Sequence, residues 1–200
     1  MNKIYEGRIF ADYYQFYIFD ASEKFCEDMP DWNEENARKG YISNGRTIYL
    51  GTMANLNYCW LDVYLSDSVP CFDDCERALS ININIASGKL GIATPNDRIA
   101  SISVKSGSYI AYVLTFNLGI DKFIDWKTNQ DFFNNNGREQ RTDTERYTIV
   151  LMPGSTRKER VIKGEKYLYS AYLSSEEMVG ISGSECLLGS GNRNHSFVSN

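Results

Sequence analysis

The segment "LSININIAS" alternates apolar and polar side chains with a period of two. On an extended chain, one face would carry the apolar members Leu79, Ile81, Ile83 and Ile85. The opposite face would carry Ser80, Asn82 and Asn84. Only a β-strand places every second side chain on the same side. The segment therefore predicts a strand with one face in a core and the other in solvent.

Similar short segments recur along most of the chain, with turn residues between them. They are "TIYLGT", "NYCWLDVYL", "KLGIAT", "IASISV", "YIAYVLTFNL" and "RYTIVLM". The turns "SG" at 87–88 and "KSGS" at 105–108 predict hairpins between their flanking strands. Residues 8–20 are apolar on both faces, which is typical of one long strand that is central in a sheet or covered by another element. Eight or more strands with almost no helix predict a mainly β protein, an antiparallel β-sandwich, with an open barrel as the alternative.

One short helix is predicted near residues 31–39, in the segment "DWNEENARKGY". Asp31 is the expected N-cap, and Glu34 stands three residues later, as in a capping box. The left-handed conformation that ends many helices favours glycine, so Gly40 is the expected stop. Trp32 is the one large apolar side chain of this segment. We therefore expect Trp32 to dock the helix on a sheet.

The net charge of −5 is unevenly distributed along the chain. Residues 20–76 contain twelve acidic and four basic residues, a balance of −8. An acidic half repels nucleic acid and attracts basic proteins. Lys and Arg are also not interleaved with the aromatic residues of this half, so we expect no direct nucleic-acid binding. Without a run of 18 apolar residues, we expect no membrane span either.

Two parts of the chain depart from the strand pattern. Residues 119–145 form a long polar, Asn-rich insertion that contains Trp126 and Phe132. Long insertions of this kind are often functional. Residues 155–200 read as a C-terminal extension, with one more hairpin and a tail rich in Gly, Ser and Asn. We therefore expect a β-sandwich domain over residues 1–154, followed by this extension.

The sequence contains no motif that points to an enzyme. Phosphate-binding loops, nucleophile elbows and zinc-protease helices are absent, and the single histidine, His195, lies near the C-terminus. A hydrolase that uses paired carboxylates stays open, because the separation of such a pair is set in three dimensions. Five cysteines without a secretion signal predict free thiols in a cytoplasmic protein. We expect no enzyme activity, no cofactor and no bound metal, with calcium at the carboxylates of residues 67–76 as an alternative.

Three segments resemble the competence protein J (ComJ) family in order and spacing: "YYQFYIF", "DWNEENARKGY" and "SNGRTIYL". The specific part of the resemblance covers residues 13–65, and a looser match of strand order continues to about residue 152. The matching residues are Tyr13, Gln15, Phe16, Phe19, Asp31, Trp32, Glu35, Lys39, Gly40, Tyr41 and Gly45. We expect Tyr13, Gln15, Phe16, Asp31, Trp32, Gly40, Tyr41 and Gly45 to be structural.

The resemblance implies a cytosolic inhibitor of a DNA-degrading nuclease in the setting of DNA uptake. Relatives of such inhibitors also act as immunity proteins against nuclease toxins, in the manner of an antitoxin. The partner would therefore be a nuclease or nuclease toxin, whose phosphate-binding groove is positively charged. An acidic surface complements such a groove. The alternative function is a β-sandwich module that binds carbohydrate or calcium.

The expected partner-binding residues fall into two groups. The acidic surface would be formed by Glu27, Asp28, Glu34, Glu35, Asp67, Asp73, Asp74 and Glu76. The polar insertion, with Trp126 and Phe132, is the second expected contact region.

Overall fold

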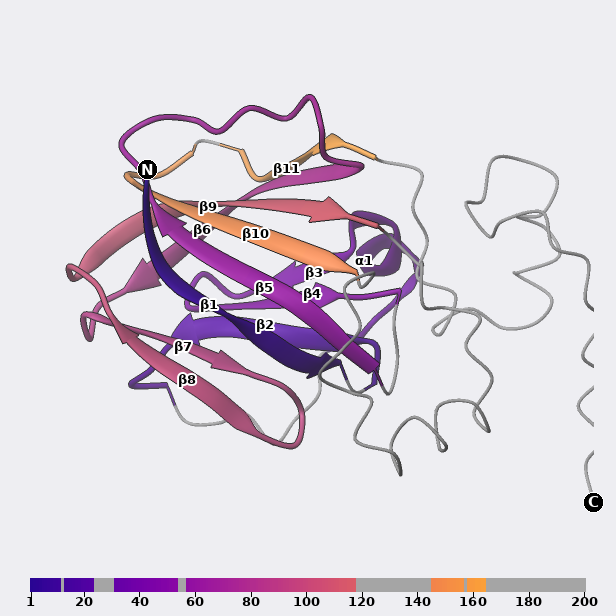
Figure 1. Cartoon of the computed structure of the whole chain (residues 1–200), viewed down its shortest axis with the longest axis horizontal. Coiled ribbons are helices and arrows are strands. Elements are labelled where there is room, and N and C mark those ends of the chain that lie inside the picture. The colour runs from indigo at the N-terminus through magenta and orange to yellow at the C-terminus, as the bar shows by residue number, and fades with distance from the viewer. Residues whose placement is uncertain (12, 24–30, 54–56, 118–144, 157, 165–200) are drawn as a thin grey trace, which may run out of the picture.

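The computed structural model describes residues 1–11, 13–23, 31–53, 57–117, 145–156 and 158–164 (Figure 1). Within these ranges the protein is mostly β, with two sheets and one short helix, α1 (Glu34–Lys39). The strands are β1 (Asn2–Ala11), β2 (Gln15–Asp20), β3 (Tyr41–Ser43), β4 (Thr47–Gly51), β5 (Asn57–Leu65), β6 (Arg77–Ile85), β7 (Lys89–Ala93), β8 (Arg98–Ser103), β9 (Gly107–Phe116), β10 (Arg146–Pro153) and β11 (Arg160–Lys163). None of the described helical residues forms a span long and apolar enough to cross a membrane.

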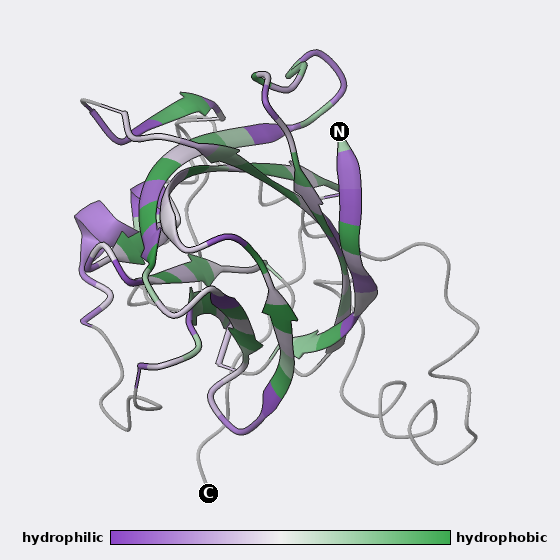
Figure 2. Ribbon diagram, turned by 90° about the vertical axis from the view of Figure 1, so that its left-hand side faces the viewer, coloured by the Kyte–Doolittle hydropathy of each residue, from purple (hydrophilic) through white to green (hydrophobic). Residues whose placement is uncertain are grey.

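The two sheets pack face to face as a β-sandwich, as the sequence pattern predicts. The first sheet has the strand order β1-β5-β10-β9-β6-β11, and the second has the order β3-β4-β2-β7-β8. Neighbouring strands are antiparallel except for β5 and β10, which run parallel with Leu61 opposite Tyr147. Figure 2 shows hydrophobic and hydrophilic residues alternating along many strands, the pattern expected of strands with one buried face.

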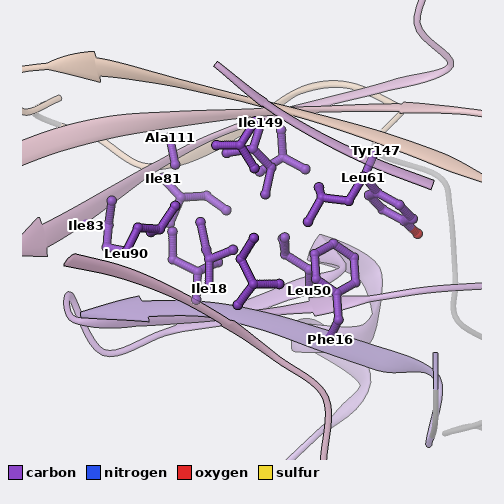
Figure 3. Packing of buried hydrophobic residues seen from close by; sticks show 14 of the residues in the cluster. Phe16, Ile18, Leu50, Leu61, Ile81, Ile83, Leu90, Ala111, Tyr147 and Ile149 are labelled. Atoms are coloured by element: carbon purple, nitrogen blue, oxygen red, sulfur yellow. The ribbon is translucent and has the colours of Figure 1, made fainter. Parts of the chain in front are cut away.

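The core lies between the sheets and is built mainly from branched aliphatic side chains (Figure 3). The predicted inward face of β6 is confirmed, because its four apolar residues are all buried there: Leu79, Ile81, Ile83 and Ile85. The second sheet contributes Phe16, Ile18, Leu50, Leu90 and Ile92. Each fully buried aliphatic side chain of this kind contributes about 1.5–3 kcal/mol to stability through the hydrophobic effect.

The two predicted hairpins are wrong. β6 and β7 lie in different sheets, and so do β8 and β9. The turn at Gly88, where φ is 71°, carries the chain from one sheet to the other. Ile83 and Leu90 then enter the same core from opposite sides (Figure 3). Turn residues indicate that the chain reverses direction. They do not specify whether the next strand hydrogen-bonds to the previous one in the same sheet or packs against it from the other sheet.

The predicted single strand over residues 8–20 is also wrong. Two consecutive residues with positive φ, Tyr13 (51°) and Tyr14 (56°), separate β1 from β2. β1 is an edge strand of the first sheet, whereas β2 is central in the second, between β4 and β7. All six residues of β2 are buried, which explains why this half of the segment is apolar on both faces.

Parts of the sequence-based predictions lie outside the described residues. These are most of the polar insertion and the predicted hairpin and tail of the C-terminal extension. The described part of the extension includes β11, which pairs with β6 at the edge of the first sheet. The domain boundary at residue 154 stays a prediction.

Candidate partner-binding surface

Helix α1 begins later than its sequence pattern predicts. Its N-cap is Asn33, not Asp31, and the Asn33 side chain accepts a hydrogen bond from the Asn36 backbone N–H at 2.9 Å. Glu34 is therefore the first helical residue and cannot form the predicted capping box. Asp31 instead contributes its backbone carbonyl, which accepts a hydrogen bond from Asn36 Nδ2 at 3.1 Å. Asn and Asp cap helices about equally well, so the pattern alone did not separate them.

The C-terminal end of α1 is held by a residue that sequence reasoning missed. Gly40 adopts the predicted left-handed conformation, with φ 70°. Arg77, at the start of β6, is only 1% exposed, and its guanidinium donates to the backbone carbonyls of Arg38 and Lys39. A cation at this end of a helix complements the helix dipole. Arg77 thus fixes the last turn of α1 to the first sheet. Arg77 and Lys39 are 38 residues apart in the chain, so no local sequence pattern predicts this contact.

Trp32 ties the segment before α1 to the second sheet. Its side chain is buried beside Tyr17 and Tyr49 on the outer face of that sheet. Its indole Nε1 donates a hydrogen bond to Gln15 Oε1 at 3.1 Å, and Gln15 is fully buried in β2. The burial of Trp32 and its hydrogen bond to Gln15 thus connect the segment before α1 to β2.

Two of the other residues of the expected structural motif are also buried. Phe16 and Tyr41 are part of the main core. Burial raises the pKa of the Tyr41 hydroxyl to about 12. Gly45 has φ 84° in the turn between β3 and β4. Tyr13 differs, because 57% of it is exposed.

The two glutamates of α1 are exposed but paired within the helix. Glu34 lies 2.6 Å from the Arg38 guanidinium, and Glu35 lies 2.5 Å from the Lys39 ammonium. The hydrogen bond from Lys39 lowers the pKa of the Glu35 carboxyl. These pairs largely neutralise the helix surface, whose acidic character is weaker than the sequence pattern suggests.

The connection between β5 and β6, here called the acidic loop (residues 66–76), carries four carboxylates and no basic residue. All four are exposed: Asp67, Asp73, Asp74 and Glu76. Val69 stands among them with 54% of its surface exposed. Among the described residues, no group of three or more acidic, His or Cys side chains is arranged to hold a metal ion.

Several contacts fix the acidic loop on the first sheet. Cys75 is buried, and its thiol donates to the Phe72 carbonyl at 3.2 Å. The Lys163 ammonium donates to the carbonyls of Phe72 and Asp73, at 3.1 and 2.9 Å. Phe72 packs against Tyr112 with ring centroids 5.9 Å apart. The loop carboxylates therefore project from a supported backbone.

The end of the acidic loop and the end of α1 are linked through one side chain. Arg77 directly follows the loop, and it is the residue that contacts the helix carbonyls. The remaining expected partner-binding residues, Glu27, Asp28, Trp126 and Phe132, lie outside the described residues.

A family model described as Competence protein J (ComJ) matches residues 8–130, more than half of the chain. The chain belongs to the ComJ family. The resemblance seen in the sequence is thereby confirmed. Arg77 and the acidic loop lie inside the matched region, as do α1 and β1–β9 apart from the first residues of β1.

Two solved structures are similar to this one. One is ComJ from Bacillus subtilis, an inhibitor of the DNA degrading activity of NucA, with 14% sequence identity and a TM-score of 0.54. The match covers 76% of this chain and 98% of that one. The other is crocagin biosynthetic gene J, with 18% identity, a TM-score of 0.49 and coverage of 75% and 96%. No curated protein matches the chain. At these identities, the likeness to ComJ establishes a shared fold.

Proposed function

We propose that this chain is a protein inhibitor of a nuclease and has no catalytic activity of its own. Membership of the ComJ family carries the proposal. It is supported by the fold shared with B. subtilis ComJ over almost the whole of that inhibitor, which acts on a DNA-degrading nuclease. The partner would be a nuclease or nuclease toxin encoded near the gene for this chain.

The acidic loop is the proposed centre of the nuclease contact. A nuclease binds phosphates through a positive groove, and the loop offers four carboxylates to such a surface. Because the loop backbone is held by Cys75 and Lys163, the carboxylates lose less conformational entropy on binding than those of a free loop. Val69 is an exposed apolar residue surrounded by these carboxylates. Many protein–protein interfaces have such an apolar centre within a polar rim.

Helix α1 is the proposed flank of this surface. To bind basic side chains of a nuclease, Glu34 and Glu35 would first have to break their ion pairs with Arg38 and Lys39. Exposed pairs of this type are worth only about 0.3–0.5 kcal/mol, so the exchange is not costly. The proposal therefore assigns the larger electrostatic contribution to the acidic loop and the smaller one to the helix. Glu27 and Asp28 belong to the flank in the same proposal.

The test is a DNA or RNA degradation assay with the purified nuclease encoded beside the gene. The intact chain should abolish degradation at a stoichiometric ratio, and Asp73→Lys should need a higher concentration. Asp97→Lys is the matched control, because Asp97 is an exposed aspartate in the turn between β7 and β8 of the other sheet. It should inhibit like the unaltered chain.

Two outcomes separate the function from its mechanism. If the folded chain neither binds the nuclease nor reduces its activity, the proposed function is wrong. If the chain inhibits, but Asp73→Lys and Asp97→Lys inhibit equally well, the acidic loop is not the binding surface.

A further inference from the structure

The outer face of β1, β5 and β10 combines aromatic and cationic side chains, which lie far apart in sequence. β1 pairs with β5 so that Arg8 stands opposite Trp60 and Lys3 opposite Tyr64. The sequence-based expectation of no nucleic-acid binding depended on the acidic charge of residues 20–76 and on cations and aromatic residues not being interleaved there. Strand pairing brings cations of β1 between the aromatic residues of β5, so the second of these grounds does not hold for this face.

The aromatic and cationic groups of this face touch one another. The Arg8 guanidinium carbon lies 5.9 Å from the centre of the Trp60 ring, and Lys3 Nζ lies 5.5 Å from that of Tyr64. At the far end of the strand pair, the rings of Phe10 and Tyr58 meet edge to face, with centroids 5.2 Å apart. All four aromatic side chains remain partly exposed.

Asp62 holds two of the cations on either side of β5. Its carboxylate is only 7% exposed and lies 2.9 Å from the Lys3 ammonium and 3.6 Å from the Arg146 guanidinium. The two cationic side chains are 39% and 50% exposed. Asp62 therefore lies below the surface, while the positive groups that it orients face solvent. Glu6 is an exposed carboxylate on the same face, 2.5 Å from Lys3.

We propose that this face binds single-stranded nucleic acid. Proteins that do so without sequence preference combine aromatic rings, on which bases stack, with cations that follow the phosphates. Side chains on one face of a strand repeat every ~6.7 Å, so Tyr58 and Trp60 can each accept a separate base. The three cations, Lys3, Arg8 and Arg146, line the same strands. This site would lie beside the acidic loop, because Tyr64 packs against the same hydrophobic cluster as Phe72 of that loop. Its test does not require a nuclease.

The test is fluorescence anisotropy of the full chain with a labelled oligodeoxythymidine at low ionic strength. Binding should weaken with salt, with a log–log slope of about −2, since each neutralised phosphate of a single strand contributes about −0.7. Trp60→Ala should weaken binding roughly fivefold or more, the effect of losing one stacked base. Trp60→Phe should recover most of the affinity, because it keeps a stacking ring.

Arg8→Ala and Arg98→Ala form a matched pair. Arg98 also lies over an aromatic ring, 5.0 Å from the centre of Phe19, but it belongs to the other sheet. Arg8→Ala should weaken binding severalfold, and Arg98→Ala should not change it. Unfolding midpoints of every variant show whether the fold is kept.

The proposal is overturned if the unaltered chain does not bind the oligonucleotide at low salt. It is equally overturned if folded Trp60→Ala binds as tightly as the unaltered chain, or if both arginine variants weaken binding to the same extent. If Trp60→Ala impairs nuclease inhibition while no oligonucleotide binds, the face recognises protein, and the nucleic-acid assignment is wrong.

Discussion

At the residue scale, Trp32 has the largest expected effect on stability. It is buried on the outer face of the second sheet and donates to the buried Gln15. Trp32→Ala should lower the free energy of unfolding by about 3–5 kcal/mol, because it leaves a cavity and removes the hydrogen bond to Gln15. Chemical denaturation followed by circular dichroism measures this change. An unchanged unfolding midpoint with lost nuclease binding would place Trp32 at the interface instead.

Asp20 is the residue expected to link stability to pH. Its carboxylate is fully buried and accepts hydrogen bonds from the backbone N–H groups of Ser22 and Ser87, at 3.0 and 3.1 Å. Burial alone would raise its pKa, but the hydrogen bonds from Ser87 and Ser22, taken together, outweigh burial and hold the pKa well below its ordinary value. The ionised form is therefore favoured in the folded state.

A carboxyl with a depressed pKa stabilises the fold above its unfolded pKa of about 3.9 and loses this effect as the pH falls toward the folded value. Asp20→Asn should therefore reduce stability at neutral pH by roughly 1.5–3 kcal/mol. The difference from the unaltered chain should shrink below about pH 4. Urea denaturation across this range measures it, with the exposed Asp97→Asn as control. A difference that stays constant with pH would contradict the role given to Asp20.

At the element scale, the position of the helix cap can be tested directly. Asn33→Ala should lower stability by about 1 kcal/mol, because it removes the acceptor for the Asn36 N–H. Asp31→Ala removes an exposed side chain whose backbone carbonyl makes the observed contact, so it should have little effect. Urea unfolding midpoints compare the two. A larger loss of stability for Asp31→Ala than for Asn33→Ala would indicate that Asp31 is the N-cap, as the sequence pattern predicts.

The strands and the helix were largely predictable from the sequence, whereas the pairing of the strands within the sheets was not. Alternation along residues 79–85 identified β6 and its buried face, because the period of two is a property of the strand itself. The Ser87-Gly88 turn identified a reversal, but the choice between pairing and crossing to the other sheet depends on which strands compete for β6. In the structure, β9 and β11 take both of its edges.

The candidate site was less predictable than the fold. The carboxylates of the acidic loop were visible in the sequence, but the Lys163 and Cys75 contacts that support the loop were not. Nor did sequence spacing reveal that Arg8 would stand opposite Trp60. The Arg8–Trp60 pairing depends on strand register between segments about 50 residues apart, and Lys163 reaches carbonyls 90 and 91 residues earlier in the chain. No local pattern encodes such contacts.

At the scale of the whole molecule, α1 joins the two sheets. Trp32 fixes its beginning to the second sheet, and Arg77 of the first sheet holds its end. The acidic loop leads directly into Arg77, so the loop and the helix share one anchor. The chain also carries a net charge of −5. The excess of acidic residues lies in residues 20–76, which contain both the helix and the acidic loop.

This charge distribution predicts how the chain should meet a nuclease. Exposed carboxylates act over a Debye length of about 8–10 Å, so their main effect is on the association rate. The double variant Asp73→Lys/Asp74→Lys should slow association with the nuclease by about tenfold or more at low salt and flatten the salt dependence. Dissociation should change much less. Stopped-flow or surface-based kinetics at several salt concentrations measures both rates.

Two single variants sharpen this prediction. Glu35→Lys should slow association less than the loop variant, since Glu35 is already paired with Lys39. Asp97→Lys, in the turn between β7 and β8, should have the smallest effect because it lies outside the proposed surface. If the loop variant and Glu35→Lys leave both the rate and its salt dependence unchanged in folded protein, the acidic surface is not the binding site. The insertion that contains Trp126 and Phe132 would then be the segment to mutate next, because it carries the remaining expected partner contacts.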